Sequence, residues 1–99
     1  MEFFIVKEKI KPNIREALRR LGYMGLAPHF SEPSYIKRLS NTGHFPRFHL
    51  YLQESNESVK FSLHLDQKQV SYRGNSAHSG EYNGETVINE ALRIKNYIL

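Results

Sequence analysis

Two short groups of histidine and carboxylate residues are the best candidates in this sequence for metal binding or proton transfer. His64 and Asp66 are two residues apart, His78 and Glu81 are three residues apart, and His49 precedes both groups. Imidazole nitrogens and carboxylate oxygens can bind zinc, manganese, iron or nickel without thiolates, and the chain has no cysteine. One hypothesis is therefore a divalent transition-metal site in a metal-binding protein or small metal-dependent hydrolase, with the ligands His64, Asp66, His78, Glu81 and His49.

The same residues can also be interpreted without a metal. His64 or His78 could form an acid/base pair with Asp66 or Glu81. No Ser-His-Asp arrangement and no phosphate-binding glycine motif accompanies them, so we favour a non-enzymatic protein and leave enzymatic activity open. Histidines on the solvent side of a sheet are also ordinary, and a carboxylate at Glu81 also suits the start of a helix.

A second set of residues combines cations with aromatic rings. The chain carries a net charge of +4 and has a pI of about 9.5. Cations beside aromatic rings are suited to holding a nucleic-acid backbone while a base stacks on a ring. This pattern predicts RNA or DNA as the leading partner, bound by Arg47, His49, Tyr51, Lys60, Arg15 and Arg19.

These candidates depend on a hairpin predicted in the middle of the chain. Apolar residues alternate with polar ones over 48–52 and again over 59–65, which is the period of a half-buried strand. If Gln53 pairs with Ser58, the apolar residues of both strands share one side. His49 and His64 then project from the other, open side, in a roughly diagonal relation.

Helical patterns flank the hairpin. One helix is expected after Pro12 with a stop at Gly22, in which Glu16 pairs with Arg20 while Arg15 and Arg19 lack an acidic partner. A second helix is expected to begin near 83–84. The prediction is one α+β domain over residues 1–99, with an antiparallel three- to four-stranded sheet and two helices packed on one face. The expected order is α-β-β-β-α, with a possible N-terminal edge strand within 1–10.

The N-terminal segment also bears on location and partners. The apolar run Phe3–Val6 is too short for a signal sequence or a membrane span, so we expect a cytoplasmic protein without membrane contact. Phe3 and Phe4 either complete the sheet or form an interface with a second copy or with another protein. A homodimer is therefore a third hypothesis.

Several stretches of the chain resemble a family of short uncharacterised cytosolic proteins from candidate-phylum bacteria. They are NIREALRRLGY over 13–23, FPRFHLYL over 45–52, FSLHLDQK over 61–68 and AHSGEYNG over 77–84. The resemblance covers most of the chain. It implies a bacterial cytosolic protein and no particular mechanism.

The expected element order is also loosely similar to that of double-stranded-RNA-binding domains, and the stretch TGHFPRF over 42–48 resembles the loop before their second strand. That family holds phosphates with a lysine-rich segment at the start of its last helix. Here the corresponding residues, GEYNGE over 80–85, are acidic. The resemblance therefore concerns topology and does not extend to the family's binding mode.

Overall fold

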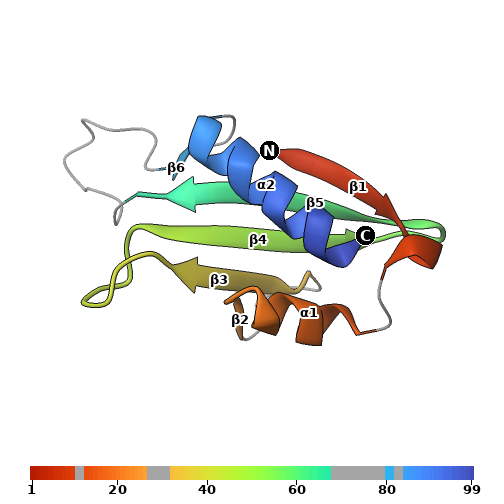
Figure 1. Ribbon diagram of the computed structural model, residues 1–99, viewed down its shortest axis with the longest axis horizontal. Coiled ribbons are helices and arrows are strands. Elements are labelled where there is room, and N and C mark those ends of the chain that lie inside the picture. Colours follow the sequence, from red (N-terminus) through yellow and green to blue (C-terminus); the bar gives the residue numbers. More distant parts are fainter. Residues whose placement is uncertain (11–12, 27–31, 68–79, 82–83) are drawn as a thin grey trace.

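The fold is a twisted antiparallel sheet with two helices (Figure 1). The structure is a computed structural model. It describes residues 1–10, 13–26, 32–67, 80–81 and 84–99, and for 80–81 it describes the backbone alone. Along the chain, β1 (Glu2–Val6), the 3-10 turn η1 (Lys7–Lys9) and α1 (Ile14–Arg20) precede the strands β2 (Met24–Leu26), β3 (Ser34–Arg38), β4 (Arg47–Glu54), β5 (Ser58–Asp66) and β6 (Gly80–Glu81); α2 (Glu85–Ile98) follows.

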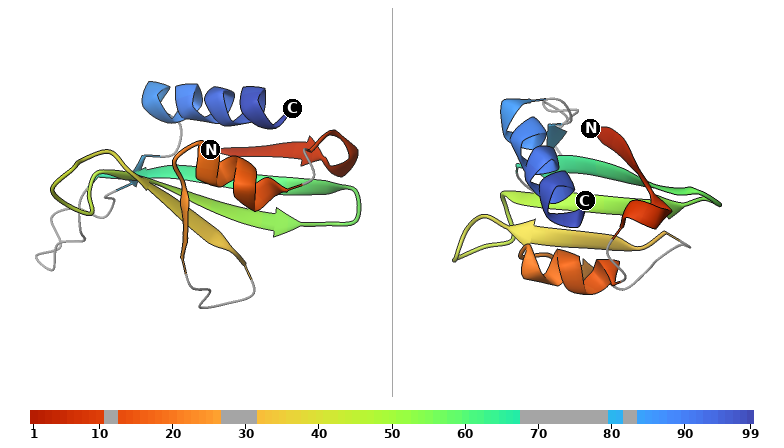
Figure 2. Two further views of the ribbon diagram at one scale, coloured as in Figure 1. Left: turned by 60° about the horizontal axis from the view of Figure 1, so that its bottom comes forward. Right: turned by 45° about the vertical axis from the view of Figure 1, so that its right-hand side comes forward.

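The strands form one sheet in the order β1-β5-β4-β3-β2, and β6 pairs with β5 beside β1. All five pairings are antiparallel. The helix α2 lies across one face of the sheet, over β5, while α1 packs against α2 and β2 near the opposite edge (Figure 2). The α+β class and the N-terminal edge strand are confirmed, but the described residues form a sheet of six strands rather than three or four.

The predicted hairpin is present, with a register two residues from the expected one. Gln53 pairs with Lys60 instead of Ser58. The cause is a tighter turn, because the Ser55 N–H donates to the Ser58 carbonyl at 2.9 Å and leaves a loop of only two residues. A shift of two keeps every side chain on its expected face, because side chains alternate with period two.

The side of the hairpin that carries the apolar residues faces the helices and forms the core. In β5 the residues alternate without exception between buried and half-buried. Both helices contribute to the same cluster as β1, β4 and β5. The largest fully buried side chains are those of Phe61, Leu18, Leu50, Leu63, Ile94, Ile98 and Val87.

Local sequence explains where the helices begin and end. The Asn13 side chain caps α1 by accepting from the Glu16 N–H at 3.0 Å. Gly22 follows the helix with φ of 103°, a conformation that favours glycine. The second helix starts after Gly84, with Glu85 in its positively polarised first turn. No helix in the described part of the chain is long and apolar enough to cross a membrane.

A buried polar network joins the two helices. The Glu90 carboxylate on α2 is 7% exposed and accepts from the Tyr23 hydroxyl at 2.6 Å. Arg93 donates to both oxygens of Glu90 at 2.7 and 2.8 Å and to the Leu21 carbonyl at 2.9 Å. Burial, together with the bond to Glu90, raises the pKa of Tyr23 far above its usual range. The network therefore fixes α2 against the end of α1.

Loss of the Glu90 carboxylate should destabilise the fold. The variant Glu90→Ala leaves the buried Tyr23 hydroxyl without its acceptor, so we expect a loss of about 2–3 kcal/mol in the free energy of unfolding. Denaturant titration measures this loss. The exposed Glu57→Ala serves as the control and should change stability by less than about 0.5 kcal/mol. Equal effects of the two variants would contradict a structural role for Glu90.

Candidate functional site

The sheet face opposite α2, here called the helix-free face, carries most of the predicted site residues. Strand pairing arranges them in rows across the sheet, because directly paired residues point to the same side. His64 pairs with His49, and His49 in turn pairs with Ile36. The histidines are thus direct neighbours rather than diagonal ones, which follows from the corrected register.

Asp66 is the centre of this group. Its carboxylate lies 3.3 Å from Nε of Arg47 and 3.2 Å from Nδ1 of His49. Nδ1 of His64 is 3.6 Å away, from the same strand as Asp66. One carboxylate therefore faces one permanent cation and two imidazoles, and it favours the tautomers that carry a proton on Nδ1.

Three aromatic rings with similarly oriented planes pack beside this carboxylate. The His49 and Tyr51 ring centroids are 4.4 Å apart, and Tyr51 and His64 are 5.2 Å apart with planes 8° from parallel. The side chains of His49 and His64 are only 12% and 17% exposed. Burial lowers the pKa of both histidines, and the nearby Asp66 only partly opposes this shift. Both imidazoles are therefore neutral at pH 7.

The second nitrogen of His49 limits what this residue can do. Nε2 is buried and has no hydrogen-bond partner among the described residues. With the proton on Nδ1, this nitrogen is an unused acceptor that solvent does not reach. Acid/base exchange between this nitrogen and a substrate is therefore not supported.

The predicted metal ligands come together only in part. Three of the five, His49, His64 and Asp66, meet on the helix-free face. His78 lies outside the described residues, and Glu81 is described only as the β6 residue that pairs with Leu65. Among the described side chains there is no group of three or more histidines and carboxylates that could hold a metal ion. Both imidazoles direct Nδ1 at the carboxylate, which explains their convergence without a metal.

The cations of the helix-free face lie near its two ends. Arg47 stacks over the Phe45 ring at 4.7 Å while it contacts Asp66. Near the other end, Lys60 lies 3.7 Å from the Glu2 carboxylate. Sequence reasoning missed Arg38, which pairs with Arg47 across β3 and β4 and is exposed. Arg38 could be identified as a neighbour of Arg47 only after the strand register was known.

The other two predicted nucleic-acid residues, Arg15 and Arg19, lie on the helix side. Arg19 binds both carboxylate oxygens of Glu16, at 2.6 and 3.0 Å, so the expectation that it has no acidic partner is wrong. The predicted pair between Glu16 and Arg20 is present at 3.3 Å. The bond to Arg19 also lowers the pKa of Glu16.

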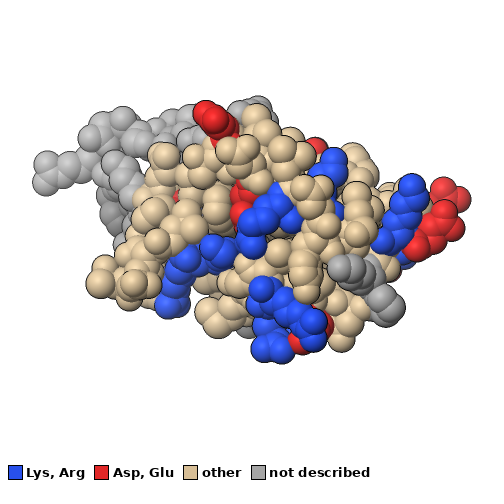
Figure 3. All heavy atoms as spheres, viewed as in Figure 1, with Lys and Arg blue, Asp and Glu red and all other residues tan. Residues whose placement is uncertain are grey.

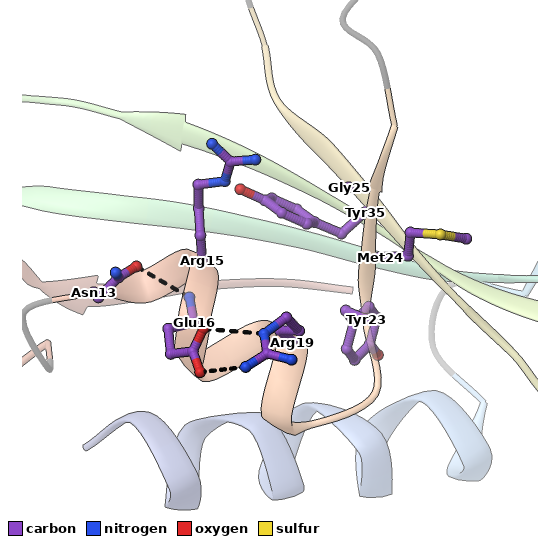
Figure 4. Close-up of a pocket in the computed structure, with 8 residues that line it drawn as sticks. All are labelled: Asn13, Arg15, Glu16, Arg19, Tyr23, Met24, Gly25 and Tyr35. Atoms are coloured by element: carbon purple, nitrogen blue, oxygen red, sulfur yellow. Dashed lines mark hydrogen bonds and ion pairs between the residues drawn. The ribbon is translucent and has the colours of Figure 1, made fainter.

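Arg15 stands beside a hollow between α1 and β2 (Figure 4). This cavity has a volume of about 600 Å³, and Tyr23, Met24, Gly25 and Tyr35 line the side opposite α1. Figure 4 shows Arg15 directed away from Glu16. It makes no hydrogen bond or ion pair within the described residues.

Basic side chains also gather on the helix side. Figure 3 shows lysines and arginines in a diagonal row from the middle of this face toward the end of β3, and in a separate group over α1. Arg93 and Arg20 belong to the helix side, and both are engaged with carboxylates there. The six predicted nucleic-acid residues therefore divide between two faces. Four share the helix-free face, and two lie on α1.

Comparison of this chain with protein-family models, curated proteins and solved structures found no match.

The two buried histidines should make stability depend on pH. Their pKa values are below the unfolded value of about 6.5, so the unfolded chain binds more protons below that pH. The free energy of unfolding should therefore fall as pH decreases from about 6.5 toward the folded-state pKa values. The double variant His49→Phe/His64→Phe should lose less stability over this range, as measured by denaturant unfolding at a series of pH values.

The exposed His44 provides the control, because His44→Gln should keep the wild-type pH dependence. An unchanged pH dependence in the double variant would show that other groups cause the loss.

Proposed function

We propose that this chain is a non-enzymatic module that binds single-stranded RNA on the helix-free face of its sheet. The observation that carries the proposal is the order of side chains across this face. Arg38 and Arg47 lie side by side near one end, the rings of His49, Tyr51 and His64 fill the middle, and Lys60 lies toward the other end.

The spacing of these groups suits an extended strand of nucleotides. Lys60 and Asp66 are six residues apart in β5, and Arg47 pairs with Asp66. At a rise of about 3.3 Å per residue, the cationic ends are separated by roughly 20 Å. Phosphates can contact the cations while an unpaired base lies against the aromatic middle.

Each group has a distinct role in this proposal. Arg38 is exposed and has no ion-pair or hydrogen-bond partner in the described part of the chain, so its guanidinium is available to a phosphate. Arg47 is held in place by Asp66 and Phe45. Tyr51 is half-buried and offers the largest of the three rings. His49 and His64 are mostly buried, and their rings stack against the Tyr51 ring.

Charge reversal on the two faces tests the proposal. Arg38→Glu should weaken binding of a mixed-sequence RNA oligonucleotide by about five- to tenfold near 0.1 M salt, because a phosphate contact becomes a repulsion. The slope of log affinity against log salt should become shallower by about 0.7, the value for one phosphate on a single strand. Fluorescence anisotropy over a salt series measures both quantities.

Arg15→Glu makes the same change in charge on the helix side and is the matched control. It should weaken binding much less than Arg38→Glu does. Arg47 is less suitable for this test, because a carboxylate there would face Asp66 and disturb the fold. A larger effect of Arg15→Glu, or preference for a duplex over a single strand, would overturn the assignment of the helix-free face. Equal affinity for single-stranded DNA would extend the ligand class to both nucleic acids.

A further inference from the structure

One edge of the sheet is a strand whose outer side pairs with no other strand in the described part of the chain. β1 is the end of the strand order, and its described partner is β5. The backbone of Met1 exchanges two hydrogen bonds with Leu63, both 2.8 Å long, and the Lys7 N–H donates to Glu57. Since bonding alternates along an antiparallel ladder, the backbone groups of Glu2, Phe4 and Val6 point away from β5.

The side chains of this strand do not protect its edge. Natural proteins block free edges with proline, lysine, bulges or a covering element. β1 has the sequence EFFIV, with no proline or lysine. Phe4 is 64% exposed and Val6 is 46% exposed, both on the helix-free face. The opposite edge differs, because β2 has only three residues and α1 packs beside it.

An exposed apolar stripe lies on α2, on the opposite face of the sheet from Phe4 and Val6. Ile88, Leu92 and Leu99 are exposed, and the helical repeat of 3.6 residues places them in one row. Around the circumference of α2, the buried residues Val87, Ala91, Ile94 and Ile98 separate this row from Glu90. Glu90 faces α1. Lys95, beside the row, lies 5.8 Å from the ring of Phe3 in β1. In Figure 1 α2 passes the N-terminal end of β1 and then diverges from it.

We propose that two copies of this chain pair their β1 strands edge to edge in a two-fold symmetric, antiparallel dimer. With the axis at Phe4, Phe4 pairs with Phe4 of the second copy and Glu2 pairs with Val6. The three outward residues of each copy then supply matching donors and acceptors to one continuous sheet. An interface of this kind is self-complementary, as closed two-fold assembly requires.

The strand edge, and not the helix stripe, is what a second copy would contact. Neighbouring strands lie about 4.8 Å apart, so the β5 strands of the two copies are separated by three spacings, or roughly 14 Å. Lys95 of α2 lies near Phe3, and Ile88 and Leu92 precede Lys95 toward the N-terminal end of β1, so a two-fold axis at Phe4 places the two stripes at opposite ends of the paired strands. The backbone edge and the exposed side chains of Phe4 and Val6 thus fit a second copy.

Sedimentation equilibrium of the full chain, from about 1 µM to about 1 mM, tests this proposal. The wild type should dimerise reversibly. Phe4→Pro removes an outward N–H that the monomer does not use, so it should weaken the dimer at least about tenfold through two lost hydrogen bonds. Leu92→Arg changes an exposed helix position away from the paired strands and should leave the dimer intact. Circular dichroism verifies that both variants are folded.

Leu39→Arg is the matched control, because Leu39 is an exposed apolar residue outside the proposed interface and its change should leave dimerisation intact. A wild type that stays monomeric, or a dimer that folded Phe4→Pro leaves unchanged, would overturn the proposal. A dimer weakened only by Leu92→Arg would also overturn the strand pairing. This result is separable from RNA binding, because added salt should weaken RNA binding and should not weaken a dimer of two like-charged copies.

Discussion

The pairing of β4 with β5 is the interaction on which the rest of the structure depends. These two strands form the centre of the sheet, and their alternating side chains divide it into an apolar side and a polar side. The apolar side provides the surface that both helices cover, with Phe61, Leu50 and Leu63 fully buried. The polar side is where the candidate site forms. A slip of one residue would exchange the two sides and remove both, whereas a slip of two preserves them.

The polar side brings together charged and polar side chains whose separate burial would cost free energy. Asp66 is largely buried, and its contacts with Arg47 and the two histidines compensate for the loss of solvent. The result is a firmly positioned cluster with neutral imidazoles and little net charge. Exposed Arg38 beside it and Lys60 toward the other end give this face its outward-facing cations. The cluster therefore acts as support, and the cations around it are the groups available to a ligand.

The two long edges of the sheet have different environments. At β2, a short strand and α1 close the edge, and the Tyr23–Glu90–Arg93 network fixes this arrangement to α2. At β1, backbone groups and apolar side chains remain exposed. This asymmetry leaves the proposed nucleic-acid surface on one face and the proposed dimer contact along one edge. A dimer would place two helix-free faces side by side and lengthen the surface offered to an RNA strand.

The sequence by itself determined the α+β class, the apolar face that both hairpin strands share, the start of α2 near Gly84 and the glycine stop at Gly22 after α1. All of these follow from local periodicity and from residues with particular backbone preferences. Tertiary structure decided the strand register, the direct contact of His49 with His64, the nearness of Arg38 to Arg47 and the ion pair of Arg19 with Glu16. Register depends on the geometry of a turn, and an alternating pattern is equally satisfied by shifts of two residues. Which side chains converge on Asp66 therefore could not be read from spacing along the chain.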